Sequence, residues 1–265
     1  MTTMAGNERF PNGAQDYVAY LETPEGRLRS DLAFAHLEDF LPRSQAEKSL
    51  CALDVGCGTG ATAVRLARLG MRVTLLDSSP AMLDIAKRTA LEAGVADKII
   101  LQIGDATRLT NLFQTRSFDV ILCHNVLEYL DDPIAVLRGA ARALRDSSGI
   151  LSILVRNRAG EVFKAAILAG DLGMAENNLT AEWGQESLYG GRVRLFTSDS
   201  LQAMLKAASL EVIAERGVRV LADYLPSRIS RSAEYERILA LERKLSSRPE
   251  YAAVARYTQF FARLP

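Results

Sequence analysis

The chain has 265 residues, 48% of them hydrophobic and 24% charged, and its 32 basic residues balance its 32 acidic ones. This composition is typical of one globular enzyme domain with insertions. No apolar run approaches the roughly 20 residues of a membrane span and residues 1–21 lack a charged-then-apolar leader, so we expect a cytoplasmic protein with no membrane partner. The three cysteines, Cys51, Cys57 and Cys123, lack the paired spacing of a metal or redox site, so we expect reduced thiols and no metal.

Strand and helix patterns alternate along the chain as far as Arg156. Crossover helices are expected from Ser79, which caps a helix with Pro80 in its first turn, and over residues 133–144. This alternation predicts an α/β fold with a doubly wound sheet. The strands are expected near residues 50–55, 72–76, 99–103, 118–123 and 149–155.

The alternation breaks after Arg156. Residues 157–196 read as an insertion, and Thr197 then caps the next helix. Residues 210–215 and 251–264 are expected to be the last two strands. Between them, residues 224–250 form a second insertion with a helix over residues 235–245.

A glycine-rich loop follows the first strand. Gly56, Gly58 and Gly60 stand at alternate positions before a helix that opens at Ala61, so backbone N–H groups can approach a ligand closely. Asp77 closes the next strand, where a carboxylate can bind the two hydroxyls of a ribose. With Ala61 in the third place, the loop also matches the dinucleotide pattern G-x-G-x-x-G/A, which leaves NAD and S-adenosylmethionine open.

Three further features favour S-adenosylmethionine. Asp54 lies two residues before the glycines, where a cationic cofactor has a use for a carboxylate and a pyrophosphate would be repelled. Asp105, in Gly104-Asp105-Ala106, ends the third strand and can reach an adenine amine. The fourth strand runs into a polar turn at His124.

These residues resemble the class I S-adenosylmethionine-dependent methyltransferases over residues 51–156. A narrower resemblance, to the SmtA-like family that includes the bacterial tRNA 5-carboxymethoxyuridine methyltransferase, covers nearly the whole chain. It is carried by Gly26-Arg27-Leu28-Arg29, by residues 123–129 and 217–225, and by Arg256-Tyr257. The resemblance implies a Rossmann-like doubly wound seven-stranded sheet with an antiparallel last strand and helical and loop cap insertions. Residues 1–265 would form one such domain, with a lid and helix over 1–45 and substrate caps over 157–196 and 224–250.

The resemblance also implies which residues bind the cofactor. Arg29 matches the arginine that holds the methionine carboxylate, with Arg27 as the alternative, and a guanidinium suits that task. Met82 is either an adenine contact or a core residue at helical spacing from Ile85. The whole expected set is Arg29, Asp54, Gly56, Cys57, Gly58, Gly60, Asp77, Ser78, Met82, Asp105, Ala106, Thr107 and His124.

The expected reaction is methyl transfer to an oxygen nucleophile. A carboxylate, as the narrower family implies, is already anionic near pH 7 and needs no general base. A phenol, hydroxyl or amine would need one, and His124 is then the candidate catalytic base, although the matching histidine of the family contacts the cofactor. Substrate contacts are expected from Tyr20, Trp183, Arg219 and Tyr224.

Charge leaves two substrate classes open. Residues 216–248 carry eight basic and four acidic side chains, as a tRNA-binding face requires, whereas residues 157–199 carry four basic and six acidic ones. The tRNA family has a lysine-rich stretch in that insertion, and this chain has Leu179-Thr180-Ala181-Glu182-Trp183-Gly184 there instead. The substrate is therefore a modified tRNA wobble uridine or a small metabolite. An NAD-dependent oxidoreductase and a non-catalytic binding module are the remaining alternatives, and the oligomeric state cannot be read from the sequence.

Overall fold

A computed structural model describes most of the chain and contains one large sheet. Parts of two expected regions, the lid over residues 1–45 and the insertion over 157–196, lie outside the described residues. The description covers residues 9–42, 49–185 and 191–265, and side chains from residue 13 onward.

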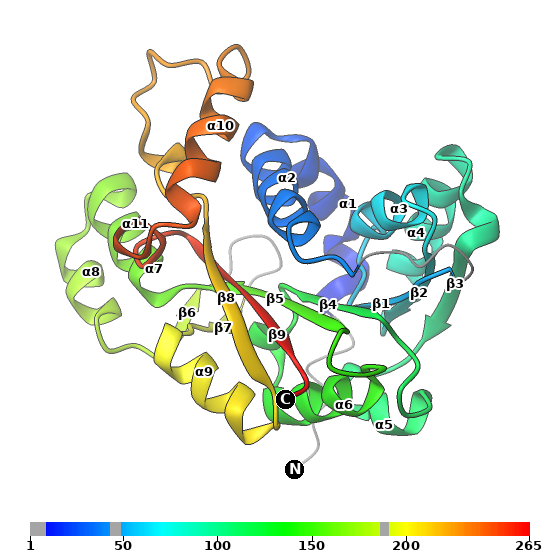
Figure 1. Ribbon diagram of the computed structural model, residues 1–265. Helices are drawn as coiled ribbons and strands as arrows, with labels where there is room; N and C mark the ends of the chain where they lie inside the picture. The colour runs from blue at the N-terminus through cyan, green and yellow to red at the C-terminus, as the bar shows by residue number, and fades with distance from the viewer. Residues whose placement is uncertain (1–8, 43–48, 186–190) are drawn as a thin grey trace.

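Seven strands of the described residues form this sheet, in the order β3-β2-β1-β4-β5-β9-β8 (Figure 1). Strands β1 to β5 are parallel, and β9 runs antiparallel to both β5 and β8. The sequence-based expectation of a doubly wound seven-stranded sheet with an antiparallel last strand is confirmed. The strands are β1 Cys51–Val55, β2 Arg72–Asp77, β3 Ile99–Ile103, β4 Val120–His124, β5 Ile150–Arg156, β8 Glu211–Val218 and β9 Tyr257–Arg263.

Helices cover both faces of the sheet. Figure 1 shows α2, α3 and α4 on one face and α5, α6 and α9 on the other. The α-helices are α1 Arg9–Glu22, α2 Pro24–Glu38, α3 Ala61–Arg68, α4 Pro80–Glu92, α5 Leu109–Leu112, α6 Pro133–Ala143, α7 Arg158–Phe163, α8 Leu172–Asn178, α9 Ser198–Ala207, α10 Tyr235–Ser246 and α11 Pro249–Ala252. The expected caps are present: the Ser79 side chain accepts the Met82 N–H at the start of α4, and Thr197 forms a capping box with Ser200 at the start of α9.

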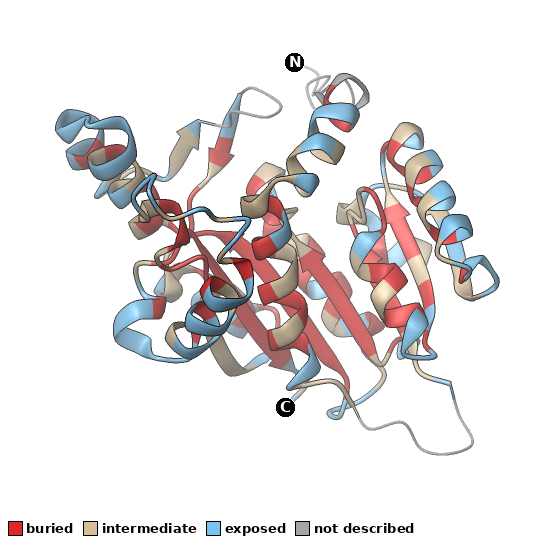
Figure 2. Ribbon diagram, turned by 90° about the horizontal axis from the view of Figure 1, so that it is seen from above, coloured by how far each residue is buried: buried red, intermediate tan, exposed pale blue. Residues whose placement is uncertain are grey.

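The core has one layer on each side of the sheet. Successive side chains of a strand point to opposite faces, so Leu53 and Ile121 pack toward α6 and α9 while Ala52 and Leu122 pack toward α3 and α4. Both layers are apolar, which explains why the parallel strands read as continuous hydrophobic runs. Figure 2 shows the buried strands at the centre, with exposed residues on the outer sides of the helices.

The boundaries of three strands differ from the prediction by two residues or more, and those of the other strands by one residue at most. The last strand begins at Tyr257, because Pro249 starts the short helix α11 where a strand had been expected from residue 251. Strand β8 continues to Val218, beyond the expected end at residue 215. Strand β4 starts at Val120, and Phe118 makes an isolated bridge to Leu144.

The insertion after β5 is mostly helical. Helix α7 runs into the π-helical segment η4 (Lys164–Ala169), and α8 follows after a turn. Strands β6 (Trp183–Gln185) and β7 (Arg192–Arg194) then form a small antiparallel sheet of their own. The expected helix over residues 235–245 is confirmed as α10, which packs against α2.

Candidate functional site

A cavity with a volume of about 1460 Å³ opens at the carboxyl ends of the parallel strands. Gly56 follows β1, Asp77 ends β2, Gly104 follows β3 and His124 ends β4, and all four line this cavity. Ligands of open α/β sheets bind at this edge. The predicted site residues on its wall are Tyr20, Arg29, Gly56, Gly58, Asp77, Ser78, Met82, Asp105, Ala106, Thr107, His124 and Arg219.

Five predicted residues lie off the cavity wall. Asp54, Cys57 and Gly60 belong to the glycine-loop region but do not line the cavity. Trp183 lies between two guanidinium groups, with its ring centroid 4.0 Å from Arg192 and 4.5 Å from Arg194. The Tyr224 hydroxyl instead reaches the Gly160 carbonyl at 3.4 Å. The ligand contacts expected of these five residues stay predictions.

Close packing explains the glycine at position 56. Its φ is +65°, and a Cβ atom there would lie 2.4 Å from Cγ2 of Val126. A side chain is therefore excluded by both backbone conformation and space. The loop is tied to the second strand, because the Gly58 N–H donates to Oδ2 of Asp77 at 3.0 Å.

Two carboxyl groups lie close to this loop, Asp54 buried and Asp77 partly buried. Oδ1 of Asp77 accepts the Ser79 N–H at 2.9 Å, and burial raises the pKa of Asp77. Asp54 is only 5% exposed, and burial together with the Asp77 charge raises its pKa to about 7. Like charges in a poorly hydrated space favour a cationic ligand, whose charge would stabilise the ionised Asp54.

Asp105 organises the third strand end. Its Oδ1 accepts the N–H and the hydroxyl of Thr107, both at 2.8 Å, and so caps the short turn over Ala106–Arg108. The other carboxylate oxygen, Oδ2, accepts no hydrogen bond from the described residues. Asp105 therefore has a structural task and still keeps an acceptor for a ligand.

Arg29 is held by tyrosines. It is 6% exposed, Nη2 donates to the Tyr17 hydroxyl at 3.0 Å, and its guanidinium lies 4.9 Å from the Tyr20 ring centroid and 5.7 Å from that of Tyr257. Arg27 instead lies over Tyr235 and does not line the cavity. Of the two arginines, Arg29 is thus the one placed to meet a ligand.

His124 is unsuited to accept a proton. Burial, with the Arg29 charge adding to it, lowers the pKa of His124 to about 3, and Nε2 already hydrogen-bonds Oγ of Ser152 at 2.8 Å. A general base works best when its pKa lies near the working pH. The structure therefore argues against the catalytic-base role that the sequence left open for His124.

Three arginines, Arg156, Arg219 and Arg256, form a cationic part of the cavity wall. Arg219 donates to both oxygens of Asp223, with Nη2 at 2.5 and 2.6 Å, and its Nη1 reaches the Tyr20 hydroxyl at 2.9 Å. Because Arg219 and Asp223 are both more than 90% buried, their ion pair is not a surface salt bridge.

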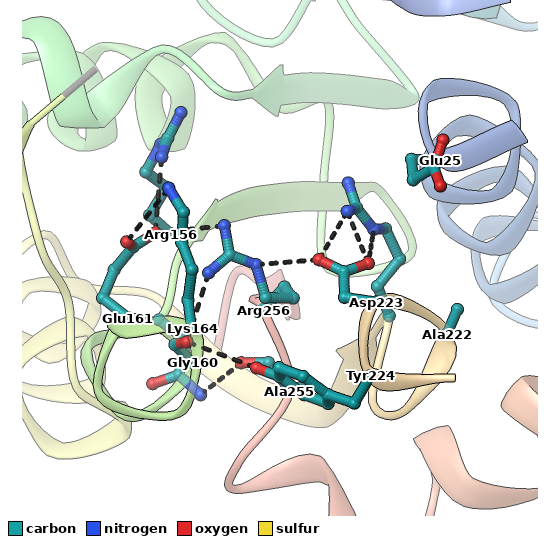
Figure 3. Close-up of polar contacts among 12 residues, drawn as sticks. Glu25, Arg156, Gly160, Glu161, Lys164, Ala222, Asp223, Tyr224, Ala255 and Arg256 are labelled. Carbon is teal, nitrogen blue, oxygen red and sulfur yellow. Dashed lines mark hydrogen bonds and ion pairs between the residues drawn. The ribbon is translucent and has the colours of Figure 1, made fainter. Parts of the chain in front are cut away.

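Arg256 and Arg156 form further ion pairs in this part of the cavity wall (Figure 3). Arg256 lies between two carboxylates, with Nε 3.1 Å from Asp223 Oδ2 and Nη2 3.3 Å from Glu161 Oε1. Arg156 joins Glu161 from the other side at 3.4 Å. We call Arg156, Arg219 and Arg256, with Asp223 and Glu161, the arginine frame. Its three guanidinium groups face two carboxylates, so the frame has a net charge of +1.

Sequence reasoning assigned no role to most of this frame. Arg256-Tyr257 and Asp223 were part of the resemblance but carried no function, and Arg156 and Glu161 were assigned no role. Glu128 was also missed: it lines the cavity fully buried, and burial raises its pKa. A carboxyl side chain four residues after a strand has no distinctive pattern, so only its burial identifies it.

Comparison with known proteins places the chain in a family. A family model described as a methyltransferase domain matches residues 53–153. A tRNA 5-carboxymethoxyuridine methyltransferase of Escherichia coli (strain K12) is 30% identical over 249 residues, which cover 92% of this chain and 90% of that protein. The chain belongs to the S-adenosylmethionine-dependent methyltransferases. This membership decides against the NAD-dependent oxidoreductase and the non-catalytic module.

Other methyltransferases resemble parts of the chain or its fold. A ubiquinone biosynthesis O-methyltransferase of Xanthomonas oryzae pv. oryzae (strain PXO99A) is 35% identical over 120 residues, 45% of this chain and 48% of that protein. The solved structure of a SAM-dependent methyltransferase from Thermotoga maritima superimposes with a TM-score of 0.64 at 16% identity, covering 97% of this chain and 99% of that one. The latter likeness shows the fold alone.

The cofactor of this methyltransferase is S-adenosylmethionine, which supplies an electrophilic methyl group on a sulfonium. The cavity suits such a molecule, because it presents the carboxylates of Asp77 and Asp105 at two strand ends and the guanidinium of Arg29 elsewhere on its wall. Among the described residues no helix is long and apolar enough to cross a membrane, and no cluster of potential metal ligands occurs.

Proposed function

We propose that this methyltransferase esterifies a carboxylate of its substrate, and that the substrate is a carboxylate-bearing modified wobble uridine of tRNA. The observation that carries the proposal is the arginine frame, whose three guanidinium groups and two carboxylates leave one excess positive charge buried beside the cavity. A carboxylate is attracted by that charge and needs no proton acceptor. The printed name of the Escherichia coli relative supports the same acceptor.

The reaction requires no side chain to transfer a proton or to form a covalent bond. One carboxylate oxygen forms a bond to the methyl carbon as the carbon–sulfur bond breaks, and no proton is transferred. The protein must align the two molecules and exclude water, and such alignment is worth roughly 7–11 kcal/mol of the barrier. In this proposal Arg219 orients the acceptor, and the hydrogen bonds that fix its guanidinium to Asp223 and Tyr20 on the cavity wall support that role.

The cofactor would bind at the glycine loop. In this proposal Asp77 binds the ribose hydroxyls beside the N–H groups of the loop, Asp105 meets the adenine through Oδ2, and Arg29 holds the methionine carboxylate. Ser78, Met82, Ala106 and Thr107 would line the adenosine side of the cavity. The described parts of the lid expected over residues 1–45 and of the caps expected over 157–196 and 224–250 would cover the substrate in this proposal.

A small carboxylic acid is the second candidate substrate. It is favoured by the acidic insertion and by the apolar side chains exposed around it, among them Phe163, Ile167 and Leu172, because neither feature attracts a polyanion. The volume of about 1460 Å³ also accommodates a metabolite together with the cofactor.

Transfer of a labelled methyl group tests both candidates. The enzyme is incubated with labelled S-adenosylmethionine and one of two acceptors. The first is tRNA whose wobble uridine carries the free carboxylate but not its methyl ester, and the second is a panel of small carboxylic acids. A methyl ester is identified by its release as methanol in mild alkali, which leaves N-methyl and ether products intact. Base-labile label in tRNA nucleosides supports the proposal, base-labile label only in small acids selects the second candidate, and base-stable label contradicts carboxylate methylation.

A pair of variants tests the arginine frame. Arg219→Lys keeps the charge but loses the planar fork, so KM for the acceptor should rise at least tenfold while S-adenosylhomocysteine affinity stays within twofold. Arg237→Lys is the matched control, because the Arg237 side chain is 85% exposed and, among the described residues, pairs with Glu234 alone. Equal KM values for both variants would remove Arg219 from substrate binding.

A further inference from the structure

A line of buried hydrogen bonds crosses the sheet behind the cavity. His36 Nδ1 lies 3.0 Å from Gln259 Oε1, Gln259 Nε2 lies 3.0 Å from Ser152 Oγ, and Ser152 Oγ lies 2.8 Å from His124 Nε2. The four residues come from α2, β9, β5 and β4, and Ser152 and Gln259 are fully buried. The line thus joins the helix that carries Arg29 to the histidine that lines the cavity.

The Gln259 amide has one possible orientation. Its Nε2 also lies 3.0 Å from the carbonyl oxygen of Ala33, which can only accept a hydrogen bond. The NH₂ group therefore faces Ala33 and Ser152, and the carbonyl oxygen faces His36. Because that oxygen is also only an acceptor, the proton of His36 must be on Nδ1. Nε2 of His36 is buried with no partner among the described residues, as fits a nitrogen without a proton.

The same reasoning fixes the proton of His124. Ser152 Oγ accepts a hydrogen bond from Gln259, so its own hydroxyl proton needs an acceptor. Nε2 of His124 is the acceptor that the described residues offer it. Both imidazoles are neutral near pH 7, since burial lowers the pKa of His36 to about 4 and that of His124 to about 3. A neutral ring whose Nε2 accepts a hydrogen bond carries its proton on Nδ1.

We propose that Ser152 and Gln259 are positioning residues that hold His124 as the Nδ1–H tautomer, so that its imidazole donates a hydrogen bond to a ligand oxygen in the cavity. His124 lines the cavity, and its Nδ1 has no hydrogen-bond partner among the described residues. The matching ligand chemistry is an acceptor oxygen, such as a carboxylate or a ribose hydroxyl. The inference concerns proton positions in the protein itself and does not depend on which substrate is methylated.

Nitrogen-15 NMR of the ligand-free protein reads these protons directly. The chain has two histidines, so a sample labelled at histidine gives two ring spectra in a long-range proton–nitrogen correlation at pH 7. We expect Nδ1 protonated and Nε2 unprotonated in both rings. His36→Asn keeps a donor close to the Nδ1 position and assigns the remaining spectrum to His124. An Nε2–H tautomer or a doubly protonated ring at His124 would overturn the proposal.

Two serine variants test whether Ser152 sets the tautomer. Ser152→Ala removes the hydroxyl that donates to Nε2, so the His124 spectrum should change to the Nε2–H form or to a mixture of tautomers. Ser152→Thr keeps the hydroxyl and suits a strand, so it should retain the Nδ1–H form. A purely structural role predicts the same tautomer in both variants, and that result would refute the positioning role.

Reversing the direction of the hydrogen bonds from Gln259 through Ser152 to His124 is a further test. Gln259→Glu presents acceptor oxygens to Ser152 in place of the amide donor, so the serine hydroxyl should donate to the glutamate instead. His124 should then donate from Nε2, and its nitrogen spectrum should invert. An unchanged Nδ1–H signal in folded protein would contradict the role of Gln259. If this variant does not fold, the native spectrum and the Ser152 pair decide the question.

Discussion

Replacing Asp54 by asparagine tests the electrostatics beneath the glycine loop. Burial and the Asp77 charge raise the pKa of Asp54 from its usual 3.8 to about 7. One pKa unit corresponds to about 1.4 kcal/mol, so this difference amounts to about 4 kcal/mol in the free energy of unfolding. Because the folded state has the higher pKa, the stabilising contribution is complete below about pH 4 and is lost as the pH rises toward 7.

The asparagine variant should lack this loss. It has the shape of the protonated carboxyl but cannot ionise, so its stability relative to the native protein should grow by about 3 kcal/mol between pH 5 and 8 and level off above 7. Urea unfolding at pH 5, 6, 7 and 8 and constant ionic strength measures the difference. Asp84→Asn, at an exposed position on α4, is the control. If the two variants differ from native protein by the same amount at every pH, Asp54 does not titrate as described.

Three further predictions concern ligand binding. A nearby cation favours the ionised form of Asp54, so the ratio of the affinity for S-adenosylmethionine to that for neutral S-adenosylhomocysteine should rise with pH. Calorimetry should show a rise of up to about tenfold between pH 6 and 8, and Asp54→Asn should abolish it. Gly56→Ala should weaken S-adenosylhomocysteine binding at least tenfold, since its Cβ would lie 2.4 Å from Val126, whereas Gly94→Ala, at φ +69° with open space around it, should leave binding unchanged. Asp77→Ala should abolish cofactor binding, and native affinity by calorimetry would end the ribose assignment.

Local sequence motifs predicted the cavity residues that lie at the ends of the strands. The glycines, Asp77, Asp105 and His124 lie at or shortly after the carboxyl ends of strands, and parallel strands bring these ends to one edge of a sheet. Any chain that folds this alternation correctly must therefore gather these residues. No such rule places residues of the insertions, where the substrate contacts were expected. Trp183 and Tyr224 were therefore expected to contact the substrate, but they do not line the cavity.

Strand boundaries were less predictable than strand identity. Tyr251 to Arg256 has the apolar content of a strand, but Pro249 has no N–H to donate to a sheet ladder and begins a helix there. Tertiary packing then sets the true start of β9 at Tyr257, where antiparallel partners are available on both sides.

By itself, the sequence determined the fold class, the cofactor and the position of the cofactor loop, because each depends on residues close together in the chain. Only the tertiary structure decided what the charged groups do. Arg156, Arg219 and Arg256 come from three separate elements and meet only when β5, β8 and β9 are assembled. Likewise, the high pKa of Asp54 and the low pKa of His124 come from burial, and burial is a property of the packed molecule that no local motif encodes.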